Sequence, residues 1–499
     1  MKKVTLGFLL LFLWMLPSQA QSIQGEILSD SGNLKVVRVW GTHYDRGFAY
    51  GYLCEPYIMA VWDEYVVPNY GTVLPFARAI IANPGNFSID SIFITEAQGI
   101  IDGLGAAGAD TSGLSYLDLF VVNFMTDLEG FMPKAGFNTQ QCSSLMNWGD
   151  ATLNTDLAGK SVIAHHLDAL SYDSVLAHNQ VMVIHLPTES NEQAWLLTGV
   201  AGQMVASQAV NVSGIAAFVN TVNNFSATAG SGYEPMTLTL RKSLERADFN
   251  GDGLHNTNDV RAALLSNSQG YARGFVVCAI APSSCLTDTL ISMVAELAPS
   301  PPAITFRHTA DVDSLIGDNL YAANEMIKRS NAQNYSSRYL QVKGAINGLY
   351  GGAGIGAQDN WDIMLDYSTQ STSLQFIQVI PEWNQFLISV SDNGLPAYHF
   401  APQEFDLQEL FSYSSVDEFG QTTSILKLFP NPAFETLSIC FDGHTGSYPC
   451  VLTDITGRIL LLIELQSGDA VDVSALSHGL YFLHINTPSG TLCGKFLKR

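Results

Sequence analysis

The spacing of hydrophobic positions changes along the chain. After "GTHYDRGFAYGYLCEPYI" a long region has the three- and four-residue apolar period of helices, as in "EAQGIIDGLGAAGAD" and "SGLSYLDLFVVNFMTDL". From residue 160 the segments "KSVIAHHLDAL", "QVMVIHLPT", "EQAWLLTGVAG" and "SGIAAFVNTV" have the shorter apolar runs of β-strands, and another helical block follows later. This order predicts an α+β fold in which sheets pack against helices.

The last part of the chain has a different pattern. From about residue 424, short alternating segments such as "SILKLFPNPAFETLSICF" and "VLTDITGRILLLIEL" are separated by Gly, Asp or Ser turns. A polar stretch, residues 412–423, precedes them and has the composition of a linker. We therefore expect a separate small β-sandwich over residues 424–499.

The first residues predict export. Lys2 and Lys3 precede an apolar run over residues 6–16, and Ser18-Gln19-Ala20 supplies the small-residue cleavage site of a secretory signal. We expect a signal peptide over residues 1–20 and a mature chain outside the cytoplasm. Because no later segment has about 18 consecutive apolar residues, no transmembrane span is expected.

Composition narrows the range of partners. The 499 residues are 47% hydrophobic and only 14% charged, which is sufficient for a large buried core. With 46 acidic and 23 basic residues the net charge is -23. Such a surface repels phosphate groups, so neither nucleic acid nor an anionic membrane is an expected partner.

The cysteine count points to disulfides with one thiol left over. Seven cysteines stand at positions 54, 142, 278, 285, 440, 450 and 493. In an exported protein cysteines commonly pair, and an odd number leaves at least one free or intermolecular. Short separation makes Cys278 with Cys285, and Cys440 with Cys450, the expected local pairs.

The segment "DFNGDGLHNTND" has the ligand spacing of a calcium loop. Its expected oxygen ligands are Asp248, Asn250, Asp252, the Leu254 carbonyl, Asn256 and Asp259, with Gly253 at the turn position. Helical patterns flank the loop, so residues 244–266 form a calcium-binding insertion in this interpretation. Aspartate at the last position resembles the dockerin form of the loop; the alternative is a plain Asp-Asn-Gly turn without metal.

Several motifs, in this order, resemble one enzyme family. They are "HYDRGFAYG", "CSSLMNWGDAT", "HHLD", "NVSGIAAFVN", "LYAANEMIKRSNAQNYSSRYLQV" and "STSLQFIQVIPEWNQFLISVSDNGLPAYHF", between about residues 38 and 410. Together they resemble the acyl-coenzyme A:isopenicillin N acyltransferase-like peptidases, which are N-terminal nucleophile hydrolases. The resemblance implies a four-layer αββα core over residues 21–411 and self-cleavage between Gln141 and Cys142. The new α-amino group would then act as the base for the Cys142 thiol.

The same resemblance implies roles for other residues. Asp168 matches the acid that orients the nucleophile's amine, with a turn-capping aspartate as the alternative. Asn324 matches a side-chain oxyanion donor. Arg338 matches an arginine near the site, with a helix-surface residue as the alternative. Asn220 and Thr221 end a strand that could offer a backbone amide.

The chain departs from the family pattern at two places. His165-His166 stand where related enzymes have an arginine, and a protonated His165 could replace that charge, although adjacent strand residues face opposite sides. Glu325 follows Asn324 where histidine is usual. For Arg46, in "HYDRGFAYG", we expect a structural role, since Gly47 and Gly51 suit close helix packing.

The C-terminal motifs "LFPNPA", "DITGR", "LSHGLYFLHI" and "GKFLKR" resemble the type A sorting domain of the type IX (Por) secretion system. This resemblance implies passage through the periplasm of a Gram-negative bacterium to its surface or beyond, with the type IX machinery as partner. An ordinary adhesive β domain is the alternative.

These observations predict a secreted, self-processing cysteine hydrolase or acyltransferase acting on a small-molecule N-acyl amide. No organic cofactor is expected, and calcium is expected only as a structural ion. The alternatives are a calcium-stabilised, catalytically inactive surface binding protein, and a phospholipase B-like enzyme or lipid amidase of the same superfamily.

Overall fold

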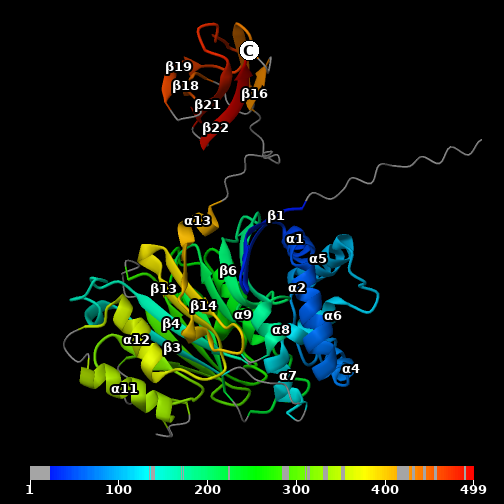
Figure 1. Cartoon of the computed structure of the whole chain (residues 1–499), viewed down its shortest axis with the longest axis vertical. Helices are drawn as coiled ribbons and strands as arrows, with labels where there is room; N and C mark the ends of the chain where they lie inside the picture. The colour runs from blue at the N-terminus through cyan, green and yellow to red at the C-terminus, as the bar shows by residue number, and fades with distance from the viewer. Residues whose placement is uncertain are drawn as a thin grey trace, which may run out of the picture. The chain divides into compact units, whose positions relative to one another are not determined.

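A computed structural model describes residues 23–133, 135, 141–169, 171, 173–222, 225–283, 291–309, 311, 315–329, 335–349, 354–412, 426–429, 433–441, 446–454, 458–487 and 490–499. The expected signal peptide and most of the expected linker lie outside these residues. The chain divides into two compact units, residues 1–413 and 414–499 (Figure 1). No helix among the described residues is long and apolar enough to span a membrane.

The larger unit contains a nine-stranded sheet with the order β1-β2-β5-β6-β7-β8-β9-β10-β11. Its strands are β1 (Gly25–Ser31), β2 (Leu34–Gly41), β5 (Gln180–Pro187), β6 (Trp195–Val200), β7 (Gln208–Asn211), β8 (Ala216–Val222), β9 (Gly274–Ile280), β10 (Ser292–Leu297) and β11 (Ile304–Arg307). Neighbouring strands are antiparallel except β2 and β5, which are parallel. The strand segments expected at residues 160–170, 180–188, 192–202 and 213–222 are confirmed.

A second, six-stranded antiparallel sheet has the order β12-β3-β4-β13-β14-β15. Its strands are β12 (Asn319–Ala322), β3 (Gln141–Asn147), β4 (Val162–Asp168), β13 (Ser373–Ile380), β14 (Gln385–Val390) and β15 (Gln403–Asp406). One hydrophobic cluster joins the two sheets, with Ile184 and Phe218 from the first and Met146 and Ile377 from the second. The mixed helix and strand class is confirmed.

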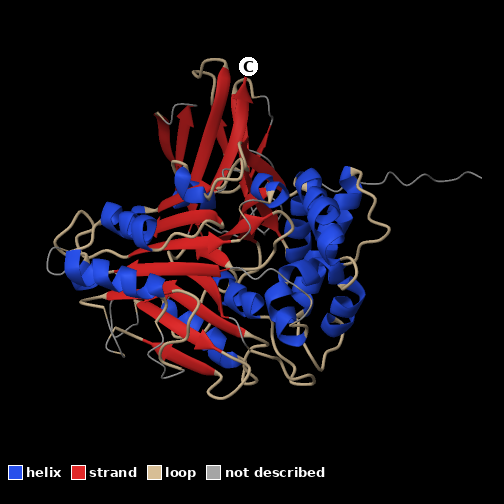
Figure 2. Ribbon diagram, turned by 60° about the horizontal axis from the view of Figure 1, so that its bottom comes forward, coloured by secondary structure: helices blue, strands red, loops and turns tan. Residues whose placement is uncertain are grey.

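Helices cover the outer sides of both sheets (Figures 1 and 2). The first region contains α1 (His43–Leu53), α2 (Glu55–Ala60), the π-helix η1 (Val61–Val66), α3 (Val67–Tyr70), α4 (Leu74–Ile81), α5 (Ser91–Ala107), α6 (Tyr116–Asn123) and α7 (Met125–Phe131). Later helices are α8 (Ser174–His178), α9 (Met236–Glu245), α10 (Thr257–Ser266), α11 (Ser337–Leu349), α12 (Ala357–Tyr367) and α13 (Leu407–Phe411). Phe93 and Val183 share a cluster on the nine-stranded sheet, and Tyr339 and Phe376 share one on the six-stranded sheet.

Helices α1 and α5 cross in close backbone contact. A Cβ atom added to Gly51 would lie 2.1 Å from the Ile100 carbonyl oxygen, and one added to Gly103 would lie 2.2 Å from that of Phe48. Real Cβ atoms never approach a carbonyl oxygen so closely, so both positions require glycine. The expectation that Gly47 and Gly51 serve helix packing is confirmed, since a Cβ on Gly47 would also meet a carbonyl oxygen.

The smaller unit consists of two antiparallel sheets, β16-β17-β20 and β19-β18-β21-β22. Their strands are β16 (Leu426–Phe429), β17 (Thr436–Phe441), β18 (Tyr448–Asp454), β19 (Ile459–Leu465), β20 (Ala470–Asp472), β21 (Gly479–Thr487) and β22 (Gly490–Lys498). Leu437 and Ile439 from one sheet and Leu452 and Leu483 from the other belong to one buried cluster. The two sheets therefore share a single apolar core.

The expected local disulfides are wrong. Cys278 and Cys450 are free buried thiols. Cys278 lies in the middle of β9 with its side chain in the cluster between the two large sheets, and Cys285 lies outside the described residues. Because Cys450 is a free thiol, it does not pair with Cys440.

Candidate active site

The candidate nucleophile lies at the start of an inner strand. Cys142 is the second residue of β3, opposite Leu167 of β4, and Gln141 pairs with Asp168. Strand β12 borders β3 on its other side. The Cys142 side chain is fully buried. Antiparallel pairing thus brings the peptide bond between Gln141 and Cys142 next to the end of β4.

Arg338 connects the other predicted residues to Cys142. From the first turn of α11, its Nη1 donates to Asp168 Oδ2 at 3.0 Å. Its Nη2 donates to Asn324 Oδ1 at 2.6 Å and to the Cys142 carbonyl at 3.2 Å. Arg338 is only 9% exposed, which contradicts the helix-surface alternative. The structure therefore brings together all four residues expected in the site.

The Asn324 side chain bridges two backbone segments. Its Oδ1 accepts a hydrogen bond from the Cys142 backbone amide at 3.3 Å, and its Nδ2 donates to the Thr221 carbonyl at 2.7 Å. Asn220 donates from Nδ2 to the carbonyls of Ala322 and Ala323. The strand end at Asn220 thus positions Asn324, and the Thr221 carbonyl accepts a hydrogen bond from its side chain.

Burial shifts the ionisation of both candidate catalytic groups. Burial, followed by the nearby charge of Asp168, raises the pKa of the Cys142 thiol, so the buried thiol stays protonated at neutral pH. Burial also raises the pKa of Asp168 to about 7, although the Arg338 guanidinium opposes this shift. Asp168 Oδ1 is buried and has no hydrogen-bond partner within the part of the chain that the structure describes. This oxygen is an available acceptor beside Cys142.

The two adjacent histidines face opposite sides of β4. His165 bonds through Nδ1 to Ser144 Oγ at 2.9 Å and stacks on Phe218 of the other sheet. His166 contacts Ser373 Oγ and stacks on Phe376. Burial lowers the pKa of both rings, that of His166 to about 3. His165 is therefore neutral and does not replace the family's arginine; Arg338 supplies the positive charge.

Glu325 has a role that the sequence did not indicate. Its Oε1 accepts from Ser336 Oγ at 2.8 Å, and Ser336 Oγ in turn accepts from the backbone amide of Tyr339. Ser336 immediately precedes α11, the helix that carries Arg338. The residue that departs from the family pattern therefore fixes the start of this helix.

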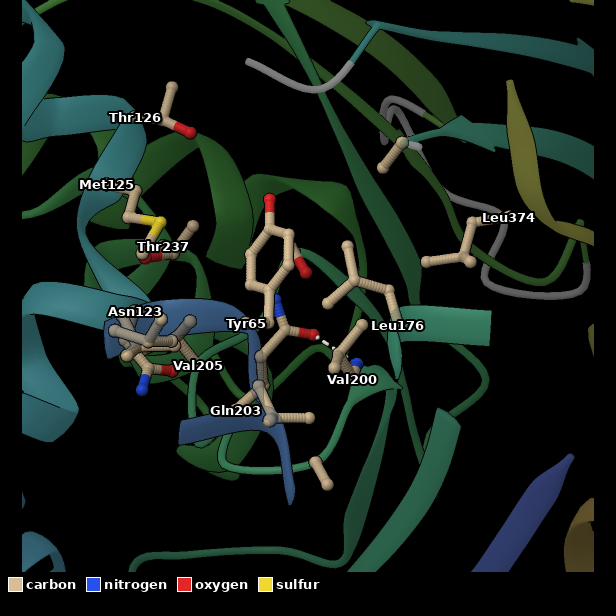
Figure 3. Close-up of a pocket in the computed structure, with 16 residues that line it drawn as sticks. Tyr65, Asn123, Met125, Thr126, Leu176, Val200, Gln203, Val205, Thr237 and Leu374 are labelled. Atoms are coloured by element: carbon tan, nitrogen blue, oxygen red, sulfur yellow. Dashed lines mark hydrogen bonds between the residues drawn. The ribbon is translucent and has the colours of Figure 1, made fainter. Parts of the chain in front are cut away.

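A cavity of about 100 Å³ with both apolar and polar lining residues lies near the end of β4 (Figure 3). It is lined by Val61, Tyr65, Val122 and Met125 from the helical region before Cys142, and by Leu176, Val200, Val205 and Leu374 from the region after it. Ala169, another lining residue, directly follows Asp168, and Leu374 follows the strand partner of Asp168. The Tyr65 ring stands in the middle of these side chains in Figure 3.

The expected calcium loop connects α9 and α10, so the predicted flanking helices are confirmed. The Asp248 carboxylate accepts from the backbone amides of Gly251 and Gly253 at 2.7 and 2.8 Å. Both glycines have left-handed φ angles, +75° and +80°. Asn256 caps α10, and Asp259 completes its capping box. The loop thus curls around the Asp248 side chain.

The donor atoms of this loop suit a hard cation. The side-chain ligand atoms of the loop are oxygens, the ligand type that calcium prefers, and they belong to Asp248, Asn250, Asp252 and Asp259. Burial raises the pKa of Asp259, and the charge of Asp248 raises it further. A divalent cation between the two carboxylates would remove this repulsion, so the residues fit calcium.

A buried ion cluster, formed by His43, Arg46, Glu96, Glu192, Arg241 and Glu245, was not foreseen. Arg241 Nε pairs with Glu245 Oε2 at 2.9 Å, and its Nη1 donates to Glu96 Oε1 at 2.9 Å. Arg46 Nη2 pairs with Glu245 Oε1 at 2.7 Å. Arg46 and Arg241 are fully buried, so the expected structural role of Arg46 is supported. The cluster joins α1 and α5 to α9.

The opposite charges within the cluster keep its members ionised although they are buried. Burial acts to lower the pKa of His43, but its hydrogen bonds to Glu192 and Glu96 outweigh burial and raise the pKa to about 9. Burial acts to raise the pKa of Glu245, but the charges of Arg241 and Arg46 outweigh it and lower the pKa to about 2. His43 and Glu192 are also close enough to Glu189 to hold a metal, but Arg46 already pairs with both glutamates.

Residues 427–499 match the family described as the secretion system C-terminal sorting domain. The type IX sorting domain expected from the C-terminal motifs is therefore confirmed, and the adhesive-domain alternative is set aside. The chain is a secreted or cell-surface protein, and the secretion machinery is its partner.

Some solved structures have a partial likeness to this chain. An N-acylethanolamine-hydrolyzing acid amidase ortholog from Caenorhabditis elegans is 11% identical, with 53% of this chain and 100% of that chain covered and a TM-score of 0.34. A mutant conjugated bile acid hydrolase from Clostridium perfringens is 12% identical, with 56% and 98% covered and a TM-score of 0.33. No curated protein matches the chain.

Proposed function

We propose that the chain is a secreted cysteine hydrolase or acyltransferase of the N-terminal nucleophile class, which cuts itself before Cys142 and then acts on a non-peptide N-acyl amide. One observation carries the proposal. Cys142, Asp168, Asn324 and Arg338 come from three strand or loop segments and one helix, and they converge on the start of β3. The alternative roles considered for Asp168 and Arg338, a turn cap and a surface residue, do not require this convergence.

We propose a four-layer αββα core for residues 21–411, between the signal peptide over residues 1–20 and the linker over residues 412–423. The three hydrophobic clusters support this arrangement. One lies between the two sheets, and each of the other two packs helices against the outer face of one sheet. The sorting domain would occupy residues 424–499 as a β-sandwich.

Self-cleavage would begin with the Cys142 thiol. Asp168, whose pKa is about 7, accepts the thiol proton while sulfur adds to the Gln141 carbonyl carbon. The peptide C–N bond breaks, the proton returns to the departing nitrogen, and a thioester joins Gln141 to the sulfur. Water hydrolyses this ester, which releases the Gln141 carboxylate and restores the thiol. The former amide nitrogen of Cys142 is now an α-amino group.

The new amine would be held where the amide nitrogen lies before the cut. Asn324 Oδ1 already accepts from that nitrogen, and Asp168 Oδ1 is free to accept a second hydrogen bond. An α-amino group with a pKa near about 8 can take the thiol proton and later give it to the leaving amine. The Nδ2 group of Asn324 has a second N–H besides the one bonded to Thr221, and this N–H can stabilise the substrate oxyanion.

The cavity supports a hydrophobic acyl group as the substrate's acyl part. Most of its lining side chains are aliphatic or aromatic, while Asn123, Thr126, Gln203, Ser207 and Thr237 are polar, and Ala169, which follows Asp168, also lines it. Among the proposed activities, this cavity therefore favours that of a lipid amidase of the same superfamily. Hydrolysis and acyl transfer differ only in whether water or an amine attacks the acyl-enzyme thioester.

The N-terminal sequences of the purified mature protein test the proposal. We expect a fragment that begins Cys142-Ser143-Ser144-Leu145, because the thiol adds to the preceding carbonyl. A thiol-reactive acylating probe should label that fragment at its first residue. One uncut chain in the mature protein would contradict self-cleavage, and an uncut chain with Cys142 in a disulfide would favour the inactive, calcium-stabilised binding protein.

The pKa of Asp168 predicts how self-cleavage depends on pH. Because only the ionised carboxylate can accept the thiol proton, the cleavage rate should rise with pH and level off above about 7. The measurement is fragment formation by freshly refolded precursor over pH values from about 5 to about 9. Asp168→Asn should be slow at every pH. A wild-type rate that falls with rising pH would contradict Asp168 as the base.

We also propose that calcium binds residues 248–259 and stiffens the insertion between α9 and α10. Asp252→Ala removes one carboxylate ligand, so it should lower the thermal unfolding temperature in calcium and leave that in chelator unchanged. Differential scanning fluorimetry with and without calcium makes the comparison. Asp366→Ala, an acidic residue outside the loop, is the control and should respond to calcium like wild type. Equal unfolding temperatures of Asp252→Ala and wild type in calcium would contradict the proposed calcium site.

A further inference from the structure

Another buried ion pair lies beside the segment that carries Asn324. Glu296 is in β10 and is completely buried, and Arg307, the last residue of β11, is 3% exposed. Arg307 Nε lies 3.4 Å from Glu296 Oε1. Burying two charges has a desolvation cost that apolar side chains of similar volume avoid. The hydrogen bonds of Glu296 and Arg307 to nearby backbone groups indicate which part of the structure the pair holds in place.

The Glu296 carboxylate binds three consecutive backbone amides. Oε1 accepts from Ile327 at 2.9 Å and from Lys328 at 3.2 Å, and Oε2 accepts from Arg329 at 2.7 Å. Charge-assisted hydrogen bonds are stronger than neutral ones, and three successive N–H groups converge on one anion only in a fixed backbone conformation. The bound segment begins three residues after Asn324.

Arg307 anchors the same segment on its other side. Its Nη2 donates to the Tyr321 carbonyl at 2.9 Å, three residues before Asn324. The guanidinium therefore contacts Glu296 and Tyr321 at once, which a planar fork of donors can do. One ion pair thus fixes the backbone on both sides of Asn324.

We propose that Glu296 and Arg307 are positioning residues for Asn324, and this inference rests on the proposed function. The ion pair holds the backbone of residues 321–329 in one position. Asn324, which lies within this segment, is then placed to reach the Cys142 nitrogen and the substrate oxyanion. Within the described part of the chain, no hydrogen bond joins Glu296 or Arg307 to Cys142, Asp168 or the cavity, so their effect passes through Asn324.

The test compares Glu296→Gln, Asn324→Ala and the double variant. Glutamine lacks the charge, and its NH₂ group cannot accept a backbone N–H, so the segment should loosen. Misplacing a catalytic group by about 1 Å can cost about a hundredfold, so we expect kcat for a fluorogenic alkanoyl amide to fall roughly ten- to hundredfold with little change in KM. Fragment formation by the precursor, which needs no added substrate, is the second readout.

The double variant separates positioning from general destabilisation. If Glu296 acts through Asn324, adding Glu296→Gln to Asn324→Ala should cause no further loss of kcat. Glu382→Gln is the matched control, because the Glu382 carboxylate also accepts backbone amides, those of Ser161 and Ser283, but beyond the far end of β13. It should keep wild-type kcat. If Glu296→Gln does not fold, Arg307→Lys takes its place, since lysine keeps the charge but loses the fork.

Two results would overturn the inference while leaving the proposed function intact. They are wild-type kcat in a folded Glu296→Gln protein, and losses that multiply in the double variant. By contrast, a wild-type chain that neither yields the Cys142 fragment nor hydrolyses the amide would overturn the proposed function, and the inference with it.

Discussion

Cys142→Ala should give a single uncut chain with no amide hydrolysis. The proposed cut and the proposed turnover use the same sulfur atom, and alanine has no nucleophile to add to either carbonyl. Because the Cys142 side chain is fully buried and small, its loss should leave the fold intact. The measurements are electrophoresis, mass spectrometry of the intact chain, and release of the amine from a panel of N-acyl amides.

Cys142→Ser separates the two reactions. The hydroxyl can still attack the Gln141 carbonyl, but it is a weaker nucleophile, so slow maturation should survive while turnover falls steeply. Cys54→Ala is the control, since Cys54 is another buried free thiol and lies on the helical side of the fold. Wild-type fragments from Cys142→Ala, or wild-type hydrolysis by it, would rule out the N-terminal nucleophile mechanism.

Arg241→Met should lower the free energy of unfolding by about 3–5 kcal/mol, the loss expected when one partner of a buried ion pair is removed. The change leaves Glu96 and Glu245 buried without their main counter-charge. It also removes the guanidinium stacked 4.7 Å from the Trp195 ring centroid. Urea unfolding followed by tryptophan fluorescence measures the effect, in a Cys142→Ala background so that every sample is one chain.

The matched control for this prediction is Arg261→Met. Arg261 lies on the exposed side of α10 over Phe306, so its replacement should change stability by no more than about 0.5 kcal/mol. Equal unfolding curves for Arg241→Met and Arg261→Met would show that the buried ion cluster contributes little to stability.

Most of the secondary structure could be predicted from the sequence, because local hydrophobic period determines it. The strand containing His165 and His166 and the helices beside Asp248 lie where the pattern placed them. Even the opposite directions of the two histidines followed from strand geometry. Gly47 and Gly51 also showed that a helix there would pack closely, although not that α5 was the partner.

The rest of the site depends on contacts between distant segments. Resemblance identified Asn324 and Arg338, but not that Thr221 offers a carbonyl or that Glu325 caps the approach to α11. Glu296 looks like one polar residue in a short apolar strand, and its three amide partners lie about 30 residues later. The disulfide prediction relied on short separation along the chain alone, and Cys278 and Cys450 are free thiols.

The position of β1 and β2 at the edge of the nine-stranded sheet determines how many molecules take part in folding after the cut. Strands β1 and β2 precede Cys142, and β2 pairs in parallel with β5, which follows it. After the proposed cut, this sheet belongs to two polypeptides. Unfolding then releases two molecules, so the melting temperature of the mature protein should rise with its concentration, whereas that of the uncut precursor should not. Refolding of the mature protein from its two fragments would be a second-order reaction. Folding of the uncut precursor is unimolecular, so the native state would form more readily before the cut than after it.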